Sequence, residues 1–238
     1  MLIKFSELTK VWKIAPKGVL HIGAHEAEES ASYNSHSWGP VIWIEAQSKL
    51  GMELSKRFFG TEDRVIHAAI WNENDLEIEL KITNNSQSSS LLDLGTHATD
   101  YPTIKVTNTE TIMTKRIDSI LTSNDVFNFV NLDIQGAELH ALQGFGDLIE
   151  SVDYVYTEVN NKEVYVGGAH FSELEKYLNT RGFFCAVVRW IPKKGWGDAI
   201  FIRSSICKSI KYKKILSLFY SVEFYGLQYI HLAKSFLT

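Results

Sequence analysis

The chain has 238 residues, of which 45% are hydrophobic, 22% charged and 12% aromatic, with 15 glycines and only 4 prolines. These proportions exclude a disordered chain, a collagen and a coiled coil, and they supply enough apolar material for a sizeable core. The formal net charge of -4 excludes a protein whose whole surface is a basic field for nucleic acid. At roughly 150 residues per domain, the length favours one large domain with an appendage, or two domains.

The charge is unevenly distributed along the chain. Residues 204–238 carry five lysines against a single glutamate and are rich in Ile, Leu and Phe, whereas the rest of the chain is acidic. We therefore expect a main domain over residues 1–203 and a basic, apolar C-terminal helical extension over residues 204–238. The extension packs as helices on the main domain, pairs two subunits in a homodimer, or makes a peripheral contact with an anionic membrane surface. The pattern alone leaves these three open.

Three features of the sequence favour a cytoplasmic protein. The two cysteines, Cys185 and Cys207, form neither a CxxC pair nor a disulfide framework. The first residues are too polar and too interrupted for a signal peptide. The apolar stretch 215–233 contains a glutamate, a glutamine and a histidine, so it falls short of a transmembrane helix.

Short apolar runs alternate with amphipathic stretches along the main domain, which is the pattern of an α/β sheet. In chain order, strands are predicted at residues 18–22, 41–44, 64–68, 127–132, 154–158, 183–188 and 198–202. Helices are predicted between them at residues 27–35, 49–58, 137–143 and 171–181. Residues 76–114 break this rhythm, because the alternating segments LEIELKI and IKVTNTETI flank a serine-rich loop, as in a β-ribbon insertion.

This order of elements predicts a doubly wound, mostly parallel sheet, in which ligands bind beyond the carboxyl ends of the strands. Five polar segments lie there: HIGAHE, EAQ, AAIWNEN, LDIQGAE and TEVNN. Gly23 and Ala24 in the first have little bulk, so a ligand can approach the backbone closely. Glu45 ends the apolar run VIWIE, where a carboxylate can accept both ribose hydroxyls of a nucleoside. Because no GxGxxG motif for a pyrophosphate is present, S-adenosylmethionine fits better than NAD.

The chain resembles the FkbM-type S-adenosylmethionine-dependent methyltransferases over about residues 18–203, in the segments VLHIGAHEAEE, VIWIEAQ, VNLDIQGAEL and WGDAIFIR. The third segment is the most specific, because Asp-x-x-Gly-Ala-Glu followed by LHALQGF is hard to obtain by chance. The chain departs from the common family pattern at three positions: His21 stands for Asp, Ala27 for Gly and Gln135 for Glu. The resemblance implies a class I methyltransferase fold, with a Rossmann-like, seven-stranded sheet and a last antiparallel strand.

The resemblance also implies where the cofactor binds. The expected contacts lie at or beside the ends of the first three strands and in the ribbon loop: Gly23, Ala24, Glu26, Glu45, Ala46, Ala69, Ile70, Ser89 and Ser90. Among these, Glu45 is expected to bind the ribose, Ala69 and Ile70 to contact the adenine, and the two serines to close over the cofactor.

Acidic and amide side chains follow the fourth and fifth predicted strands. Asp133 ends the apolar run FNFVNL and is expected beside the cofactor and the acceptor, where it removes a hydroxyl proton as a general base. Glu158 and His25 are the other candidate catalytic groups. A divalent metal is the less favoured alternative, with Asp133 and Glu158 as its ligands. The predicted acceptor contacts are Gln135, Glu138, Asn160 and Trp196.

Each of these acids also has a purely structural interpretation. Asp133 can bond the backbone of the turn at residues 135–136, and Glu138 can stabilise the N-terminus of the helix that it begins. Trp196 can equally be an indole packed beside a β-hairpin turn. The sequence leaves these alternatives open.

We interpret the chain as an O-methyltransferase that acts on a sugar hydroxyl of a bacterial surface glycan or of its nucleotide-linked precursor. The density of Asp, Glu, Asn, His and Trp in the expected pocket suits a polyol better than an apolar ring. One alternative is a methyltransferase of a polyketide or another secondary metabolite. An alternative of another class is a non-catalytic scaffold that retains the fold. Nucleic acid is not an expected partner.

Overall fold

The computed structural model describes residues 1–122 and 124–206. A seven-stranded sheet has the order β3-β2-β1-β7-β8-β10-β9. Its strands are β1 Val19–Ile22, β2 Val41–Glu45, β3 Arg64–His67, β7 Phe129–Leu132, β8 Tyr154–Asn160, β9 Phe183–Trp190 and β10 Trp196–Arg203. The pairs from β3 through to β8 are parallel, whereas β10 is antiparallel to both β8 and β9. The expected Rossmann-like sheet with its reversed last strand is therefore confirmed.

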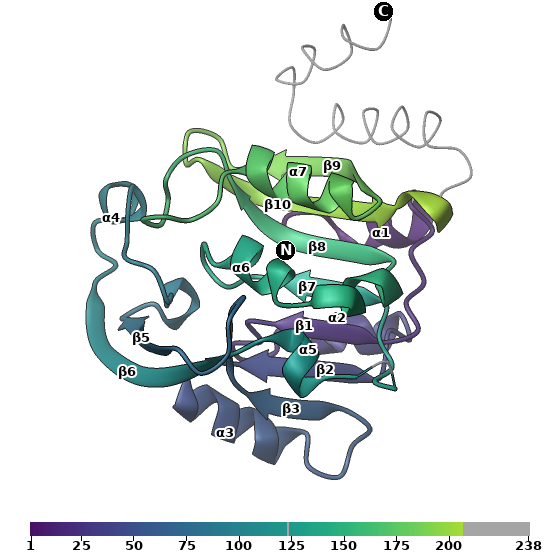
Figure 1. The fold of residues 1–238 in the computed structure, drawn as a ribbon, viewed down its shortest axis with the longest axis horizontal. Coiled ribbons are helices and arrows are strands. Elements are labelled where there is room, and N and C mark those ends of the chain that lie inside the picture. The colour runs from purple at the N-terminus through teal and green to yellow at the C-terminus, as the bar shows by residue number, and fades with distance from the viewer. Residues whose placement is uncertain (123, 207–238) are drawn as a thin grey trace, which may run out of the picture.

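Helices cover both faces of this sheet, as Figure 1 shows. They are α1 Phe5–Lys10, α2 Ser30–Ser35, α3 Ser48–Arg57, α5 Ile117–Ile120, α6 Glu138–Gln143 and α7 Phe171–Thr180. The first three bury side chains such as Leu8, Tyr33 and Leu54 on one face, and the last three bury side chains such as Leu142 and Leu178 on the other. The strands are apolar on both faces because each face is covered, which is typical of parallel sheets.

The predicted β-ribbon insertion is present. Strands β5 Glu77–Thr83 and β6 Val106–Lys115 form an antiparallel pair, and the short strand β4 Ala69–Ile70 joins β6 in parallel. The connection from β5 to β6 contains the 3₁₀ helix η1 Ser86–Ser88 and helix α4 His97–Asp100. In Figure 1 this insertion stands at the left of the sheet, at the end where the parallel strands finish. It therefore forms a wall beside the expected ligand site.

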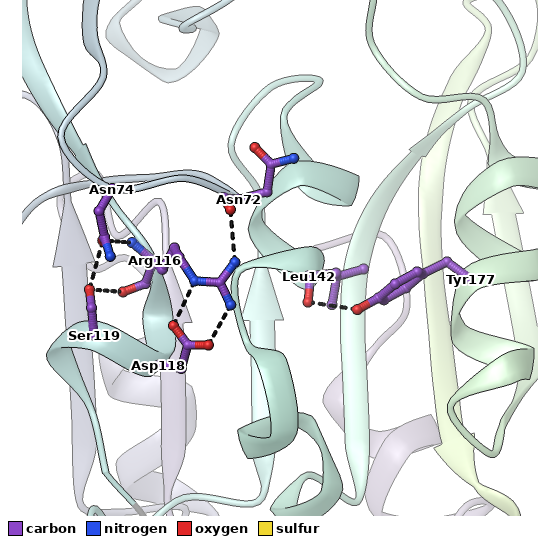
Figure 2. A network of polar contacts seen from close by, with 7 residues as sticks. All are labelled: Asn72, Asn74, Arg116, Asp118, Ser119, Leu142 and Tyr177. Atoms are coloured by element: carbon purple, nitrogen blue, oxygen red, sulfur yellow. Dashed lines mark hydrogen bonds and ion pairs between the residues drawn. The ribbon is translucent and has the colours of Figure 1, made fainter.

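Arg116 ties the base of the ribbon to the body of the domain (Figure 2). Its guanidinium donates to the carbonyl oxygen of Asn72 at 2.8 Å and binds both carboxylate oxygens of Asp118. The side-chain oxygen of Asn74 accepts hydrogen bonds from the Arg116 N–H and from the Ser119 hydroxyl, each at 2.8 Å. These contacts join the segment that enters the ribbon to the segment that leaves it, so the ribbon is held in a fixed place relative to α5.

Helix α2 begins three residues later than the helix predicted at 27–35. His25 and Ala27 have φ angles of 47° and 54°, and residues with a left-handed backbone do not continue a right-handed helix. The turn after β1 is therefore longer, and the helix begins at Ser30.

Helices α1, α4 and α5, of four to six residues, were not predicted because such short segments carry little periodic signal. Two further 3₁₀ helices are η2 Gly146–Ser151 and η3 Ser204–Ile206. The rest of the expected C-terminal extension lies outside the described residues. In the part of the chain that the structure describes, no helix is long and apolar enough to cross a membrane.

Candidate active site

A cavity of about 580 Å³ lies at the carboxyl ends of the parallel strands, beside the ribbon insertion. This volume is within the range of small-molecule sites. Of the residues predicted from the sequence, it is lined by Gly23, Ala24, His25, Glu45, Ala46, Ala69, Ile70, Ser89, Ser90, Asp133, Gln135, Glu158 and Trp196. Glu26, Glu138 and Asn160 do not line it. The fold thus brings most of the predicted residues to one place.

Glu45 ends β2 with only 4% of its surface exposed. Its Oε2 accepts a hydrogen bond from the backbone N–H of His25, and its Oε1 accepts one from that of Gln47, both at 2.7 Å. Burial raises the pKa of Glu45, while the two backbone donors favour the charged form. Since each carboxylate oxygen has two lone pairs, Glu45 keeps the capacity to accept hydroxyl groups of a ligand in the cavity.

The turn after β1 shapes the cavity floor. Gly23 has a φ of 85°, and a Cβ at this position would lie 1.9 Å from the carbonyl oxygen of Asp133. Only glycine therefore allows the ends of β1 and β7 to approach so closely. The N–H groups of Gly23 and Ala24 both donate to the carbonyl oxygen of Ile44 at 2.9 Å. Because these two N–H groups already have an acceptor, the turn does not donate hydrogen bonds to a ligand through them. It contributes instead a narrow backbone that a ligand can approach closely.

The serine-rich loop, residues 84–90 with the 3₁₀ helix η1, is held by hydrogen bonds over one end of the cavity. The His25 ring contacts the Ser86 hydroxyl through Nε2 and the Glu28 carboxylate through Nδ1, both at 2.7 Å. Gln47 Nε2 donates to the carbonyl oxygen of Ser86 at 3.1 Å, and Gln87 Nε2 donates to Glu28 at 2.9 Å. Both nitrogens of the His25 ring are thus engaged in holding the loop against the turn after β1.

Gln135 lies between the two predicted catalytic carboxylates. Its Nε2 donates to Asp133 Oδ1 at 2.5 Å and to Glu158 Oε2 at 3.1 Å, while its Oε1 accepts a hydrogen bond from the Tyr165 hydroxyl. The backbone carbonyl of Gln135 accepts a hydrogen bond from the Ser90 hydroxyl at 2.6 Å. Its φ of 56° is uncommon for a residue other than glycine. Gln135 therefore fixes both carboxylates and also binds the serine-rich loop.

The protonation of the two carboxylates follows from their surroundings. Asp133 is open to the cavity, yet protein atoms surround it, and burial together with the nearby Asp198 carboxylate raises its pKa to about 6. Burial also raises the pKa of Glu158, and the charges of Asp133, Glu138 and Asp198 add to the effect. At neutral pH Asp133 is mostly ionised and has a pKa near the working range of a general base.

Glu138 supports the turn after β7 from below. It is 3% exposed, and its Oε1 accepts hydrogen bonds from the N–H groups of Ile134 and Gly136, both at 3.1 Å. Burial raises the pKa of Glu138 to about 7. The structural role that one interpretation gave to Asp133 is thus taken by Glu138, which leaves the Asp133 side chain facing the cavity.

The opposite end of the cavity is built by β10 and the first residues of the chain. Asp198 is 6% exposed and accepts hydrogen bonds from the Tyr156 hydroxyl and, at 2.5 Å, from the Leu2 N–H. Trp196, two residues earlier on β10, donates its indole N–H to the Tyr101 hydroxyl at 3.1 Å. This end therefore combines a buried carboxylate with aromatic rings.

Among the lining residues that were not predicted from the sequence are three aromatic side chains close to one another: His97, Tyr101 and Tyr165. The His97 ring lies 5.0 Å from the Tyr101 ring and 5.5 Å from the Tyr165 ring, measured between centroids. The first two belong to the insertion, where no period or motif marks a site residue. Tyr165 could have been found, because it follows the end of the parallel strand β8 and precedes the glycine pair of the segment VYVGGAH.

In the described part of the chain, no group of three or more His, Cys, Asp or Glu side chains is arranged to hold a metal ion. The alternative metal pair, Asp133 and Glu158, is bridged by the amide nitrogen of Gln135. An amide NH₂ group donates hydrogen bonds and does not ligate cations. The donor set between these carboxylates thus fits a hydrogen-bonded pair better than a metal site.

Comparison with known proteins gives one family match. Residues 21–185 match the family model described as the methyltransferase FkbM domain. Comparison with curated proteins gives no match.

Similar solved structures include three of low identity. A protein of the NADB-Rossmann superfamily from Streptococcus agalactiae is 14% identical, with 90% of this chain and 74% of that chain covered and a TM-score of 0.48. A B. subtilis M1A22 tRNA methyltransferase is 12% identical, with 85% of this chain and 67% of that chain covered and a TM-score of 0.44. Magnesium protoporphyrin IX methyltransferase from Synechocystis with bound SAM is 11% identical, with 78% of this chain and 69% of that chain covered and a TM-score of 0.41. At these TM-scores the likenesses carry no argument about this chain.

Proposed function

The chain belongs to the FkbM methyltransferase family, and from that premise we propose that it transfers a methyl group from S-adenosylmethionine to a hydroxyl group of a sugar in a glycan. The observation that carries the proposal is a single cavity with buried Glu45 at one end and Asp133, Glu158 and Trp196 toward the other. The first end suits a nucleoside, and the second suits a polar acceptor with an apolar ring face.

The residues at the first end fit the cofactor. Glu45 is buried, is held by two backbone donors and keeps lone pairs for the two ribose hydroxyls. Ala69 and Ile70 of β4 offer small apolar surfaces for the adenine ring. Asp133 would provide a carboxylate at the methionine end, and His25 would keep the serine-rich loop closed through its contact with Ser86.

When bound, S-adenosylmethionine supplies a methyl group on a positively charged sulfur, and the sulfur keeps the electron pair of the bond that breaks. The acceptor oxygen forms the new bond to carbon, and its proton moves to a carboxylate oxygen of Asp133. Gln135 orients that carboxylate through its amide nitrogen. Glu158 binds a neighbouring hydroxyl of the acceptor, and the ring of Trp196 packs against the apolar face of the sugar.

Mass spectrometry tests this proposal. The full chain is incubated with S-adenosylmethionine and a panel of glycans and free sugars, and the products are examined for a gain of one methyl group. The proposal predicts methylation of at least one sugar by the unaltered protein and its loss in Asp133→Asn. Methylation confined to polyketide-type acceptors would contradict the sugar assignment. Failure to bind S-adenosylmethionine in calorimetry would favour a non-catalytic scaffold.

A further inference from the structure

The end of the cavity far from Glu45 carries an excess of carboxylates. Asp133 follows β7, Glu158 lies on β8 and Asp198 lies on β10, so three neighbouring strands each contribute one acid. Glu158 and Asp198 are register partners in the antiparallel β8–β10 pair, so their side chains leave the same face of the sheet. Like charges directly opposite each other destabilise a sheet. The repulsion between these carboxylates is therefore unfavourable, and a positively charged ligand bound between them would reduce it.

No Lys or Arg side chain in the described part of the chain forms an ion pair with these three acids. Among the described residues that line the cavity, six are Asp or Glu and none is Lys or Arg. Burial lowers the pKa of His21 to about 4 and also lowers that of His97, so both imidazoles are neutral at pH 7. Met1 also lines the cavity, and its α-amino group lowers the pKa of Asp133 and Asp198, although no ion pair joins it to either carboxylate in the described chain.

One buried side chain that lines this cavity has a polar atom without a partner in the described chain. His97 is 6% exposed, and its Nδ1 has no hydrogen-bond partner among the described residues. A neutral imidazole nitrogen without a proton accepts a hydrogen bond. Together with the three carboxylates, His97 therefore gives the cavity lining more acceptors than donors, which suits a ligand that donates hydrogen bonds.

Strand spacing separates these acids from the cofactor. Neighbouring strands lie about 4.8 Å apart, so Asp198 on β10 is four strand steps, or about 19 Å, from Glu45 on β2. The cofactor is assigned to the ends of β2, β1 and β7. The acids of β8 and β10 therefore face the acceptor, while Asp133 stands at the boundary between the two.

We propose that this end of the cavity binds the acceptor through a protonated amine, held between Asp133, Glu158 and Asp198, while a hydroxyl of the same molecule receives the methyl group. The inference rests on the proposed function and narrows its sugar to an amino sugar with a free ammonium group. An ammonium group has three N–H donors and no acceptor, which matches the excess of acceptors described above. The rings of Trp196 and Tyr165 line the same cavity and favour a cation near their faces.

The same charge distribution disfavours a nucleotide-linked acceptor. A diphosphate would bring negative charges into a lining with six carboxylates and no lysine or arginine among the described residues. Repulsion between a diphosphate and these carboxylates would weaken the binding of a nucleotide-linked sugar, and such repulsion contributes to specificity as favourable contacts do. The acceptor is thus expected to enter as a free or glycosidically linked amino sugar.

Calorimetry on the full chain saturated with S-adenosylhomocysteine tests the inference with three probes: methyl glucosaminide, its neutral N-acetyl counterpart and a UDP-linked N-acetyl sugar. We expect the amine to bind at least tenfold more tightly than the N-acetyl sugar, and the UDP-linked sugar to bind most weakly. Equal affinities, or tighter binding of either of the other two probes, would overturn the inference. Competition between the amine and S-adenosylhomocysteine would also overturn it, because the acids would then belong to the cofactor.

Isosteric variants locate the effect. Asp198→Asn should weaken the amine at least tenfold while the N-acetyl sugar and S-adenosylhomocysteine change less than twofold. Glu158→Gln should also weaken the amine at least tenfold, with a smaller loss for the N-acetyl sugar, whose hydroxyl Glu158 also binds, and with S-adenosylhomocysteine changed less than twofold. Asp147→Asn removes an exposed acid outside the cavity and serves as the matched control, with no change expected. Unchanged amine affinity in both cavity variants would refute the assignment.

The proposed function can fail separately from this inference. If the protein does not bind S-adenosylhomocysteine at all, the proposed function fails. The amine titration of the ligand-free protein then still decides whether the acidic end prefers an ammonium group.

Discussion

Replacing Glu45 by alanine should weaken cofactor binding more than any other single change at the nucleoside end of the cavity. The carboxylate is 4% exposed and would accept both ribose hydroxyls in a site shielded from water. Loss of a charged acceptor with two partners costs about 2–3 kcal/mol. This corresponds to a Kd for S-adenosylhomocysteine about 30- to 160-fold higher. Glu45→Gln keeps one acceptor oxygen and should weaken binding about tenfold.

Isothermal titration calorimetry measures this change. Glu45→Ala also leaves the N–H groups of His25 and Gln47 without their acceptor, so circular dichroism must first show that the variant is folded. Glu53→Ala on α3 removes an exposed glutamate and is the matched control. A folded Glu45→Ala protein that binds S-adenosylhomocysteine within threefold of the unaltered chain would refute the assignment of the ribose to Glu45.

Three further predictions concern the reaction and stability. Asp133→Asn should lower kcat about a hundredfold with cofactor affinity little changed, and activity of the unaltered protein should fall as the pH drops through about 6, because the base is then protonated. Arg189→Ala leaves buried Glu7 unpaired and should lower the free energy of unfolding by about 3–5 kcal/mol in urea denaturation. Arg116→Ala should accelerate amide hydrogen exchange in β5 and β6 while β1 and β7 stay protected.

For each of the three substitutions, one result would contradict the prediction. Near-normal turnover of Asp133→Asn would make that residue part of the turn scaffold. An urea midpoint of Arg189→Ala equal to that of the unaltered chain would show that the ion pair with Glu7 is not needed for stability. Uniformly faster exchange in Arg116→Ala would mean that the ribbon does not open as a separate unit.

The sheet was predictable because its central strands β1, β2 and β7 are buried on both faces. Runs such as VIWI and FNFVNL are mostly apolar and do not alternate between polar and apolar residues, so a parallel sheet covered by helices follows from the sequence. Glu45 and Asp133 were predictable for a related reason, since each is the first acid after such a run and lies at the carboxyl edge of the sheet. Local sequence and one topological rule thus locate both ends of the cavity.

The partners of those acids were not predictable. That Gln135 bridges Asp133 and Glu158 depends on its left-handed backbone and on the β7–β8 pairing, which brings together residues far apart in the chain. The N–H groups of Gly23 and Ala24 donate to the carbonyl oxygen of Ile44, because β1 and β2 stay paired through the turn. Contacts of this kind depend on which strands pair and on where side chains from distant parts of the chain meet, and the local patterns that locate strands do not show this.

The account is tested most directly by a crystal structure of the chain with S-adenosylhomocysteine. It predicts the ribose hydroxyls at hydrogen-bond distance, about 2.6–3.2 Å, from Glu45, and the sulfur in the same cavity on the side of Asp133. A ligand bound outside this cavity, or a ribose that does not contact Glu45, would contradict it.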